Sequence, residues 1–148
     1  QPGPGCAVVD AHNTAGWQTR TEKVIAASWT STGRGECVAY SNDGGRTFTE
    51  YEGNPVVEGP SAPEVRWIPE HGKFFLWGHR KNSQTELWTS EDGINFEYHS
   101  VAVNAANIGT RNATYTRVYE YPLEKLGSRY LMLYSGFIEE RGIRCIPL

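Results

Sequence analysis

Short apolar runs alternate with polar turns along the chain. In the first part, apolar runs cover 6–10, 24–29, 36–40 and 48–51. Runs of this length, rich in β-branched and aromatic residues and bounded by Gly, Asn and Ser, are typical of strands joined by hairpins. No stretch has the 3.6-residue period of an amphipathic helix. The pattern therefore predicts an all-β protein.

One turn motif occurs twice. Ser41-Asn42-Asp43-Gly44-Gly45-Arg46-Thr47-Phe48 returns in altered form as Ser90-Glu91-Asp92-Gly93-Ile94-Asn95-Phe96, about 49 residues later. An Asp that accepts nearby backbone N–H groups, followed by glycine at positive φ, is the chemistry of a tight hairpin loop. Two such loops at this interval predict the blades of a β-propeller. We assign one domain, 1–148, with blade-like units at 6–57, 62–101 and 115–148.

The third unit stops before a third Asp loop and its outer strand. The sequence thus predicts about two and a half blades of four-stranded antiparallel sheet, a partial five-bladed propeller. A blade buries its faces only against neighbouring blades. We therefore expect either the remainder of a longer chain or a homodimer, in which two copies supply about five blades.

Composition and charge exclude several classes of binding partner. The formal net charge of -3 leaves no basic block for a general nucleic-acid surface. The longest apolar runs are too short to span a bilayer, so we expect no membrane partner. Cys6, Cys37 and Cys145 form no metal-binding pattern, and we expect no metal and no cofactor. We interpret them as small buried residues, with a Cys6–Cys145 bridge left open.

The first unit resembles a known family. Cys6-Ala7-Val8-Val9-Asp10 and the run 40–57, which contains the first Asp loop, are similar to glycoside hydrolase family 32. These invertases, levanases and inulinases are five-bladed propellers that cleave β-fructosides. The second unit, around 62–68 and 72–76, looks more like the family 43 arabinanases and xylosidases, which share that architecture. The resemblance favours an extracellular or periplasmic location.

The resemblance also implies where catalytic carboxyl groups should stand. Retaining glycosidases use a carboxylate nucleophile and a carboxylic acid, and family 32 adds an Asp that stabilises the transition state. That Asp aligns with Ala62, the acid/base Glu aligns with Thr114, and no Asn-Asp-Pro-Asn-Gly nucleophile motif occurs. Glu36 precedes Cys37 as in the acid/base motif, but it lies inside the first unit and not at the start of a blade. We therefore assign no catalytic residue.

Four residues are candidates for ligand binding. Glu64, Arg117 and Asp10 are expected near the propeller axis, where they could bind a polar ligand such as a sugar. The alternative, which we favour, is an ion pair between Glu64 and Arg117 that joins two blades. Trp17 lies in a polar loop and is the candidate stacking residue for a sugar ring.

The leading interpretation is a glycosidase-like propeller module that is not catalytic by itself and binds carbohydrate. One alternative is a fragment of an active, retaining β-fructosidase whose catalytic blades lie outside this chain. A second alternative is a structural or oligomeric interaction module.

Overall fold

The structure is a computed structural model that describes residues 2–80, 84–108, 113–123, 127–136 and 144–147. Within these residues the regular structure consists of β-strands and one short 3-10 helix, η1 (Ala105–Ile108). The expectation of an all-β protein is confirmed. No helix among the described residues has the length and apolar character needed to cross a membrane.

The first blade is a four-stranded antiparallel sheet in chain order. Its strands are β1 (Pro2–Asp10), β2 (Val24–Ser31), β3 (Gly35–Ser41) and β4 (Thr49–Glu50). β1 begins before the predicted start at residue 6. Gly5 makes this extension possible, because a Cβ atom at Gly5 would lie 2.2 Å from the backbone oxygen of Ser28 on β2.

The second blade repeats this arrangement. It contains β5 (Ser61–Ile68), β6 (Lys73–Arg80), β7 (Gln84–Ser90) and β8 (Glu97–Asn104), again in chain order. The repeat is confirmed by the strand register. Ile25 pairs with Ser41 in the first blade, and Phe74 pairs with Ser90 at the equivalent place in the second.

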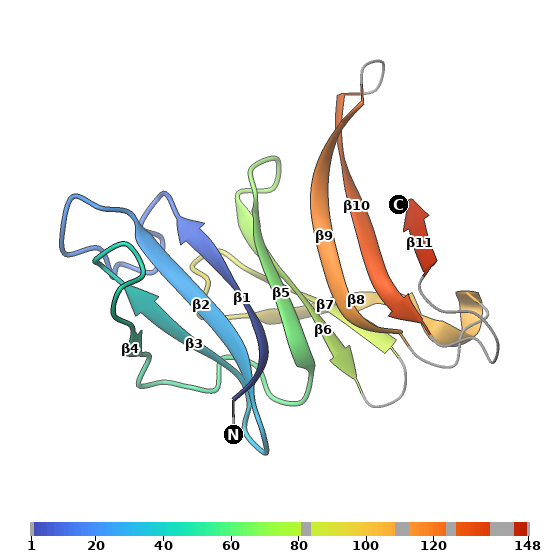
Figure 1. Cartoon of the computed structure of the whole chain (residues 1–148), viewed down its shortest axis with the longest axis horizontal. Coiled ribbons are helices and arrows are strands. Elements are labelled where there is room, and N and C mark those ends of the chain that lie inside the picture. The colour runs from blue at the N-terminus through green and yellow to red at the C-terminus, as the bar shows by residue number, and fades with distance from the viewer. Residues whose placement is uncertain (1, 81–83, 109–112, 124–126, 137–143, 148) are drawn as a thin grey trace.

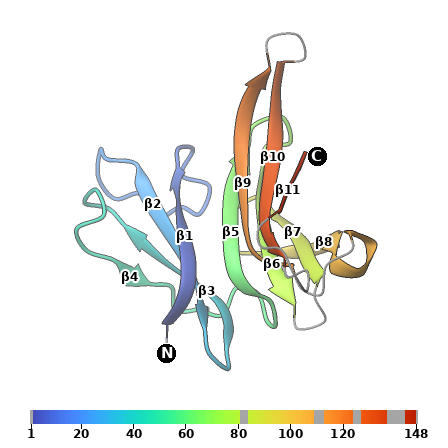
Figure 2. The same ribbon diagram turned by 45° about the vertical axis from the view of Figure 1, so that its right-hand side comes forward.

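The third sheet contains three strands in the described part of the chain. These are β9 (Ala113–Leu123), β10 (Gly127–Gly136) and β11 (Arg144–Pro147), in the order β11-β10-β9. The first strands of the three sheets, β1, β5 and β9, lie side by side, and the sheets fan out from them (Figures 1 and 2). This is the arrangement of blades around part of a propeller axis.

Apolar side chains fill the two seams between the sheets. Between the first and second blades, Val65, Phe74 and Leu76 form a buried cluster against which Cys6 and Val8 of β1 pack. Between the second and third, the buried cluster consists of Ile68, Trp77, Val118 and Met132. Each blade is therefore held by its neighbour, as expected for blades that bury their faces only against one another.

The two Asp loops share one hydrogen-bond pattern. Oδ1 of Asp43 accepts the backbone N–H groups of Arg46 and Thr47 at 3.0 and 2.9 Å. Oδ1 of Asp92 likewise accepts those of Ile94 and Asn95 at 2.9 and 2.8 Å.

A serine completes each loop. Ser41 Oγ accepts the N–H of Gly45, and Ser90 Oγ accepts that of Gly93. Both glycines have positive φ, 85° and 76°. The second loop therefore reaches the same pattern with one residue fewer between serine and glycine.

The loops hold both aspartates in the ionised form. Hydrogen bonds from the side chain and backbone of Thr47 and from Ser41 keep the pKa of Asp43 well below its usual value. For Asp92, partial burial acts to raise the pKa. Hydrogen bonds from the N–H groups of Asn95 and Ile94 outweigh that burial and hold the pKa at about 2.

We expect Asp92→Ala to lower the free energy of unfolding by roughly 1–3 kcal/mol, because two backbone N–H groups lose their acceptor. The neighbouring Glu91 makes an exposed ion pair with Lys73, so Glu91→Ala should change the free energy by less than about 0.5 kcal/mol. Urea denaturation of the two variants and the parent chain measures both effects. Equal stability of the two variants would contradict a scaffold role for the loop.

Candidate functional site

An open recess lies where β1, β5 and β9 meet. It has a volume of about 340 Å³ and is lined by 6–8 of β1, 64–67 of β5 and Arg117 of β9. Residues 64, 66 and 117 are charged, while the rest of the lining is largely apolar. We call it the axial recess.

Glu64 is the central charge of the axial recess. Its side chain is only 5% exposed, and its two carboxylate oxygens have different partners. Oε1 accepts from Nε of Arg66 at 3.1 Å, and Oε2 lies 3.5 Å from Nη1 of Arg117. The structure thus brings Glu64 and Arg117 together across the seam between the second and third blades, as the ion-pair interpretation predicts.

The two arginines are held in place but remain partly open to solvent. Arg66 lies over the ring of Tyr119, 5.5 Å from its centroid, which is a cation–π contact. Arg117 donates from Nη1 to the backbone oxygen of Thr116 at 2.9 Å. Their side chains are 37% and 38% exposed. Guanidinium N–H groups can therefore reach a ligand in the recess without disturbing Glu64.

Cys6 lines the opposite side of the axial recess. Its Sγ accepts the backbone N–H of Val65 at 3.1 Å, which links β1 to β5. Burial raises the pKa of the Cys6 thiol to about 11, although the hydrogen bond from Val65 acts against this. The thiol is therefore protonated at neutral pH and is a poor nucleophile. Cys6 and Cys37 are free thiols. The side chain of Cys145, for which the sequence left a bridge to Cys6 open, lies outside the described part of the structure.

Ala62 stands at the start of β5 in an unusual backbone conformation. Its φ is 55°, in the left-handed region that residues other than glycine seldom adopt. Its side chain is buried, and its N–H donates to Thr30 Oγ1 of β2 at 2.7 Å. The methyl group at position 62 can neither donate nor accept a proton, so it supplies no acid/base or electrostatic function.

Behind Ala62 lies a buried carboxyl group that sequence reasoning did not select. The hydroxyl of Thr30 donates to Oε1 of Glu36 at 3.2 Å, and Glu36 is fully buried. Burial raises the pKa of Glu36 to about 8, and the Thr30 hydrogen bond only partly opposes this. Glu36 is therefore largely protonated at neutral pH. A polar residue inside the apolar strand 36–40 was the available signal for it.

Thr114, the other position of interest, lies on β9 and pairs with Ser135 of β10. Its side chain lies outside the described part of the structure. Two residues further on, Thr116 is buried and its hydroxyl is 3.3 Å from that of Thr85 on β7. The start of β9 is thus anchored to the second blade.

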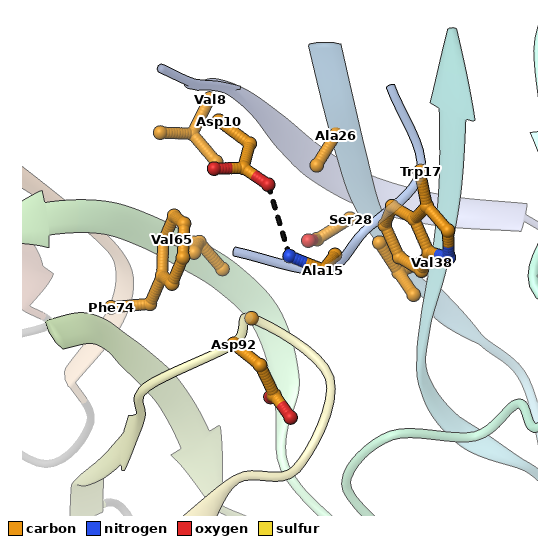
Figure 3. Close-up of a pocket in the computed structure, with 11 residues that line it drawn as sticks. Val8, Asp10, Ala15, Trp17, Ala26, Ser28, Val38, Val65, Phe74 and Asp92 are labelled. Carbon is orange, nitrogen blue, oxygen red and sulfur yellow. Dashed lines mark hydrogen bonds between the residues drawn. The ribbon is translucent and has the colours of Figure 1, made fainter. Parts of the chain in front are cut away.

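The other two candidate residues lie away from the axial recess. Asp10 is buried at the end of β1 and accepts the N–H groups of Thr14 and Ala15 at 3.0 and 3.2 Å, which shapes the following loop. Figure 3 shows the hydrogen bond with Ala15. Trp17 is half-buried and stacks on Tyr40 with ring centroids 4.5 Å apart. Asp10 and Trp17 both line a cavity of about 10 Å³ (Figure 3), which is room for about one water molecule. The structure does not join these two residues to Glu64 and Arg117.

No group of three or more His, Cys, Asp or Glu residues that could hold a metal ion occurs in the described residues. Arg66, which sequence reasoning missed, stands two residues after Glu64. Its position on the same face of β5 was the signal that could have identified it.

The fold is that of part of a β-propeller. The chain belongs to glycoside hydrolase family 32: the model described as "Glycosyl hydrolases family 32 N-terminal domain" matches residues 4–122. The resemblance drawn from the first unit is confirmed, whereas the likeness of the second unit to family 43 stays a prediction.

Relatives and solved structures agree with this family. The chain is 42% identical over 80 residues to a levanase of Bacillus subtilis, covering 49% of this chain and 12% of the levanase. It is 36% identical over 120 residues to an invertase of Schizosaccharomyces pombe, covering 73% of this chain and 21% of the invertase. An exo-inulinase from Aspergillus awamori has the same fold, with a TM-score of 0.71 at 18% identity, over 92% of this chain and 32% of the inulinase chain. The chain thus spans about a fifth or less of these two relatives.

We expect the Glu36 carboxyl to make stability depend on pH. The folded state holds its proton up to about pH 8, whereas the unfolded chain releases it near the ordinary value of 4.5. The free energy of unfolding should therefore fall as pH rises from about 5 to 8, by at most about 1.4 kcal/mol per pH unit. Glu36→Gln should flatten this slope in urea denaturation at each pH. Glu58→Gln, at an exposed position, is the control and should keep the slope of the parent chain. Equal slopes of stability against pH in the parent chain and in Glu36→Gln would contradict the raised pKa of Glu36.

We expect Glu64→Gln to destabilise the seam between the second and third blades. The substitution leaves two guanidinium groups beside a neutral amide and should cost about 1–3 kcal/mol, less than a fully buried pair because both arginines are partly solvated. Glu50→Gln, which breaks the exposed pair with Arg34, should cost less than about 1 kcal/mol. Thermal and urea denaturation measure the difference, and equal costs would show that the seam ion pair contributes no more than a surface pair.

Proposed function

We propose that this family 32 propeller region binds a β-fructoside carbohydrate in the axial recess and does not hydrolyse it. The observation that carries the proposal is Ala62. Its backbone N–H is taken by Thr30, its side chain is a methyl group, and Glu36, the carboxyl group bonded to the same Thr30, is fully buried.

The axial recess supports binding by its donors and acceptors. Arg66 and Arg117 each present a partly solvated guanidinium group, and Glu64 fixes both in position. Vicinal hydroxyl groups of a sugar can accept from such fixed N–H donors. The names of the relatives, levanase and invertase, indicate fructosides as the first ligands to test.

A second candidate is that the chain is part of an active β-fructosidase whose catalytic carboxylates lie outside it. The small share of the relatives that the chain spans favours this alternative. The two functions differ in turnover, because the first predicts binding alone and the second predicts hydrolysis only in a longer protein.

We expect the chain to bind the trisaccharide 1-kestose in isothermal titration calorimetry and to release no fructose from it. Arg117→Met should weaken binding at least about tenfold, because it removes fixed donors from the recess. Lys73→Met removes an exposed cation at the rim and should leave binding unchanged. Circular dichroism checks that both variants are folded.

Three results would overturn the proposal. Absence of kestose binding by the folded chain rejects carbohydrate binding, and equal affinity of Arg117→Met and Lys73→Met rejects the axial recess. Fructose release by the chain itself rejects the non-hydrolytic assignment.

A further inference from the structure

Two neighbouring hollows lie at the rim of the second blade, where β8 begins. The first, which we call the apolar notch, has a volume of about 230 Å³ and is lined by residues 51, 53 and 55–56 of the first blade and by 94–97. The second, the acidic hollow, has a volume of about 300 Å³ and is lined by Lys73, by 89–92 and by the shared residues Asn95 and Glu97. We propose that together they bind a basic peptide, which adds to the free edge of β8 as an extended strand.

The apolar notch is continuous with the core of the first seam. Tyr51, Pro55 and Val56 line it from the first blade, and Ile94 and Phe96 line it from the second. Val56 and Phe96 also pack against the buried cluster of that seam, and the other three side chains are half-buried. A partly covered apolar surface of this kind accommodates an apolar side chain.

The walls of the apolar notch are fixed on both sides. On the second blade, Asp92 accepts the N–H groups of Ile94 and Asn95 with Oδ1 and the side-chain amide of Asn95 with Oδ2, the last at 2.7 Å. On the first blade, a Cβ atom at Gly53 would lie 2.6 Å from the ring of Tyr51, so glycine allows this ring its position. A site with fixed walls loses little conformational entropy on binding.

Carboxylates surround both hollows. The segments 47–60 and 89–98 contain no lysine or arginine, and each contains three acidic residues: Glu50, Glu52 and Glu58 in the first, and Glu91, Asp92 and Glu97 in the second. Arg34 pairs with Glu50, and Lys73 pairs with Glu91. Glu97 is exposed and has no hydrogen bond or ion pair within the described residues. The excess negative charge favours a cationic partner.

The two hollows lie on opposite faces of the second sheet. Glu97 pairs with Thr89, and Thr89 pairs with Phe75, so these three side chains share one face. Phe75 packs against the cluster of the second seam. Phe96 packs against the cluster of the first seam. The acidic hollow therefore belongs to the face toward the third blade, and the apolar notch to the face toward the first.

The edge of β8 lies between the hollows. β8 is the outer strand of its sheet, in the order β5-β6-β7-β8. Its N–H and C=O groups on the side away from β7 have no strand partner in the part of the chain that the structure describes, and an extended peptide can pair with them.

A peptide in this position directs alternate side chains to opposite faces of the sheet. An apolar residue enters the notch, and the next residue, a lysine or arginine, reaches Glu97 and the acidic hollow. A metal ion or a small polyamine would use the carboxylates alone, and the described residues contain no group of acidic or His and Cys side chains able to hold a metal ion. A peptide that alternates apolar and basic residues matches all three features.

Neither hollow shares a lining residue with the axial recess. This inference therefore does not rest on the proposed function, and either site can fail alone.

The test follows NMR chemical shifts of the isotope-labelled full chain on addition of acetylated, amidated peptides. We expect Lys-Val-Lys-Val-Lys to give saturable shifts at 51–56 and 94–99. Lys-Lys-Lys-Val-Val has the same composition and charge without the alternation, and it should bind at least about tenfold more weakly. Glu-Val-Glu-Val-Glu should give no saturable shifts at these positions, because its charges are repelled.

N-methylated forms of the alternating peptide test the pairing with β8. In a strand added to one edge, every second residue directs its N–H toward the sheet. N-methylation of either the valines or the lysines, but not of both sets equally, should therefore weaken binding at least about tenfold.

Two charge-reversal variants test the acidic hollow. Glu97→Lys should weaken binding of the alternating peptide at least about tenfold. Glu120→Lys makes the same change at an exposed position of β9 and should alter the affinity by less than about twofold, because screening by salt limits distant charges. Circular dichroism checks that both variants are folded.

Four results would overturn the proposal. These are absence of peptide binding by the folded chain, equal affinity for the alternating and the reordered peptide, equal effects of the two N-methylated forms, and equal effects of Glu97→Lys and Glu120→Lys. Shifts confined to 6–8 and 64–67 would likewise reject the rim site, because the peptide would then occupy the axial recess.

Discussion

Contact between neighbouring sheets is the constraint on which this structure depends. Each blade is built from local hairpins, yet its apolar faces are buried only against the next blade. The inner strands β1 and β5 are further joined by the hydrogen bond from Val65 to the Cys6 thiol. The same contact places the axial recess, since it lies where the inner strands of the sheets meet.

The axis of this propeller is held by polar contacts between the blades. The turn at Ala62 is fixed by Thr30, whose hydroxyl accepts the N–H of Ala62 and donates to the buried Glu36. The charged groups Glu64, Arg66 and Arg117 contact one another across the second seam. This cluster stabilises the fold and presents partly solvated hydrogen-bond donors to the axial recess.

Most of the fold could be predicted because its strands and turns follow from local sequence patterns. Two Asp loops and the apolar runs between them identified the strands and the equivalence of Ile25 and Phe74. The candidate site was harder to predict from the sequence. Glu64 and Arg117 could be placed together because both lie near the start of a blade. The sequence gives no information on side-chain direction, so it could not show that Asp10 points away from the axis or that the ring of Trp17 is covered. Asp10 shapes its own loop, and Trp17 packs on Tyr40. Thr30 and Glu36 act through contacts between segments far apart in sequence, which no local pattern encodes.

The two Asp loops differ by one residue, and this difference has a consequence for how such blades diverge. Ser41 and Ser90 keep the same register with the strand beside them, although the chain between serine and glycine is shorter in the second loop. The Asp carboxylate accepts hydrogen bonds from the N–H groups that the loop presents to it, in the longer loop and in the shorter one. A loop can therefore be one residue shorter without a shift in the register of the neighbouring strand. Length changes at the rim are therefore tolerated, whereas a one-residue change in β5 would reverse which side chains face each seam. Homologous blades should accordingly vary in length at the rim and keep their spacing near the axis.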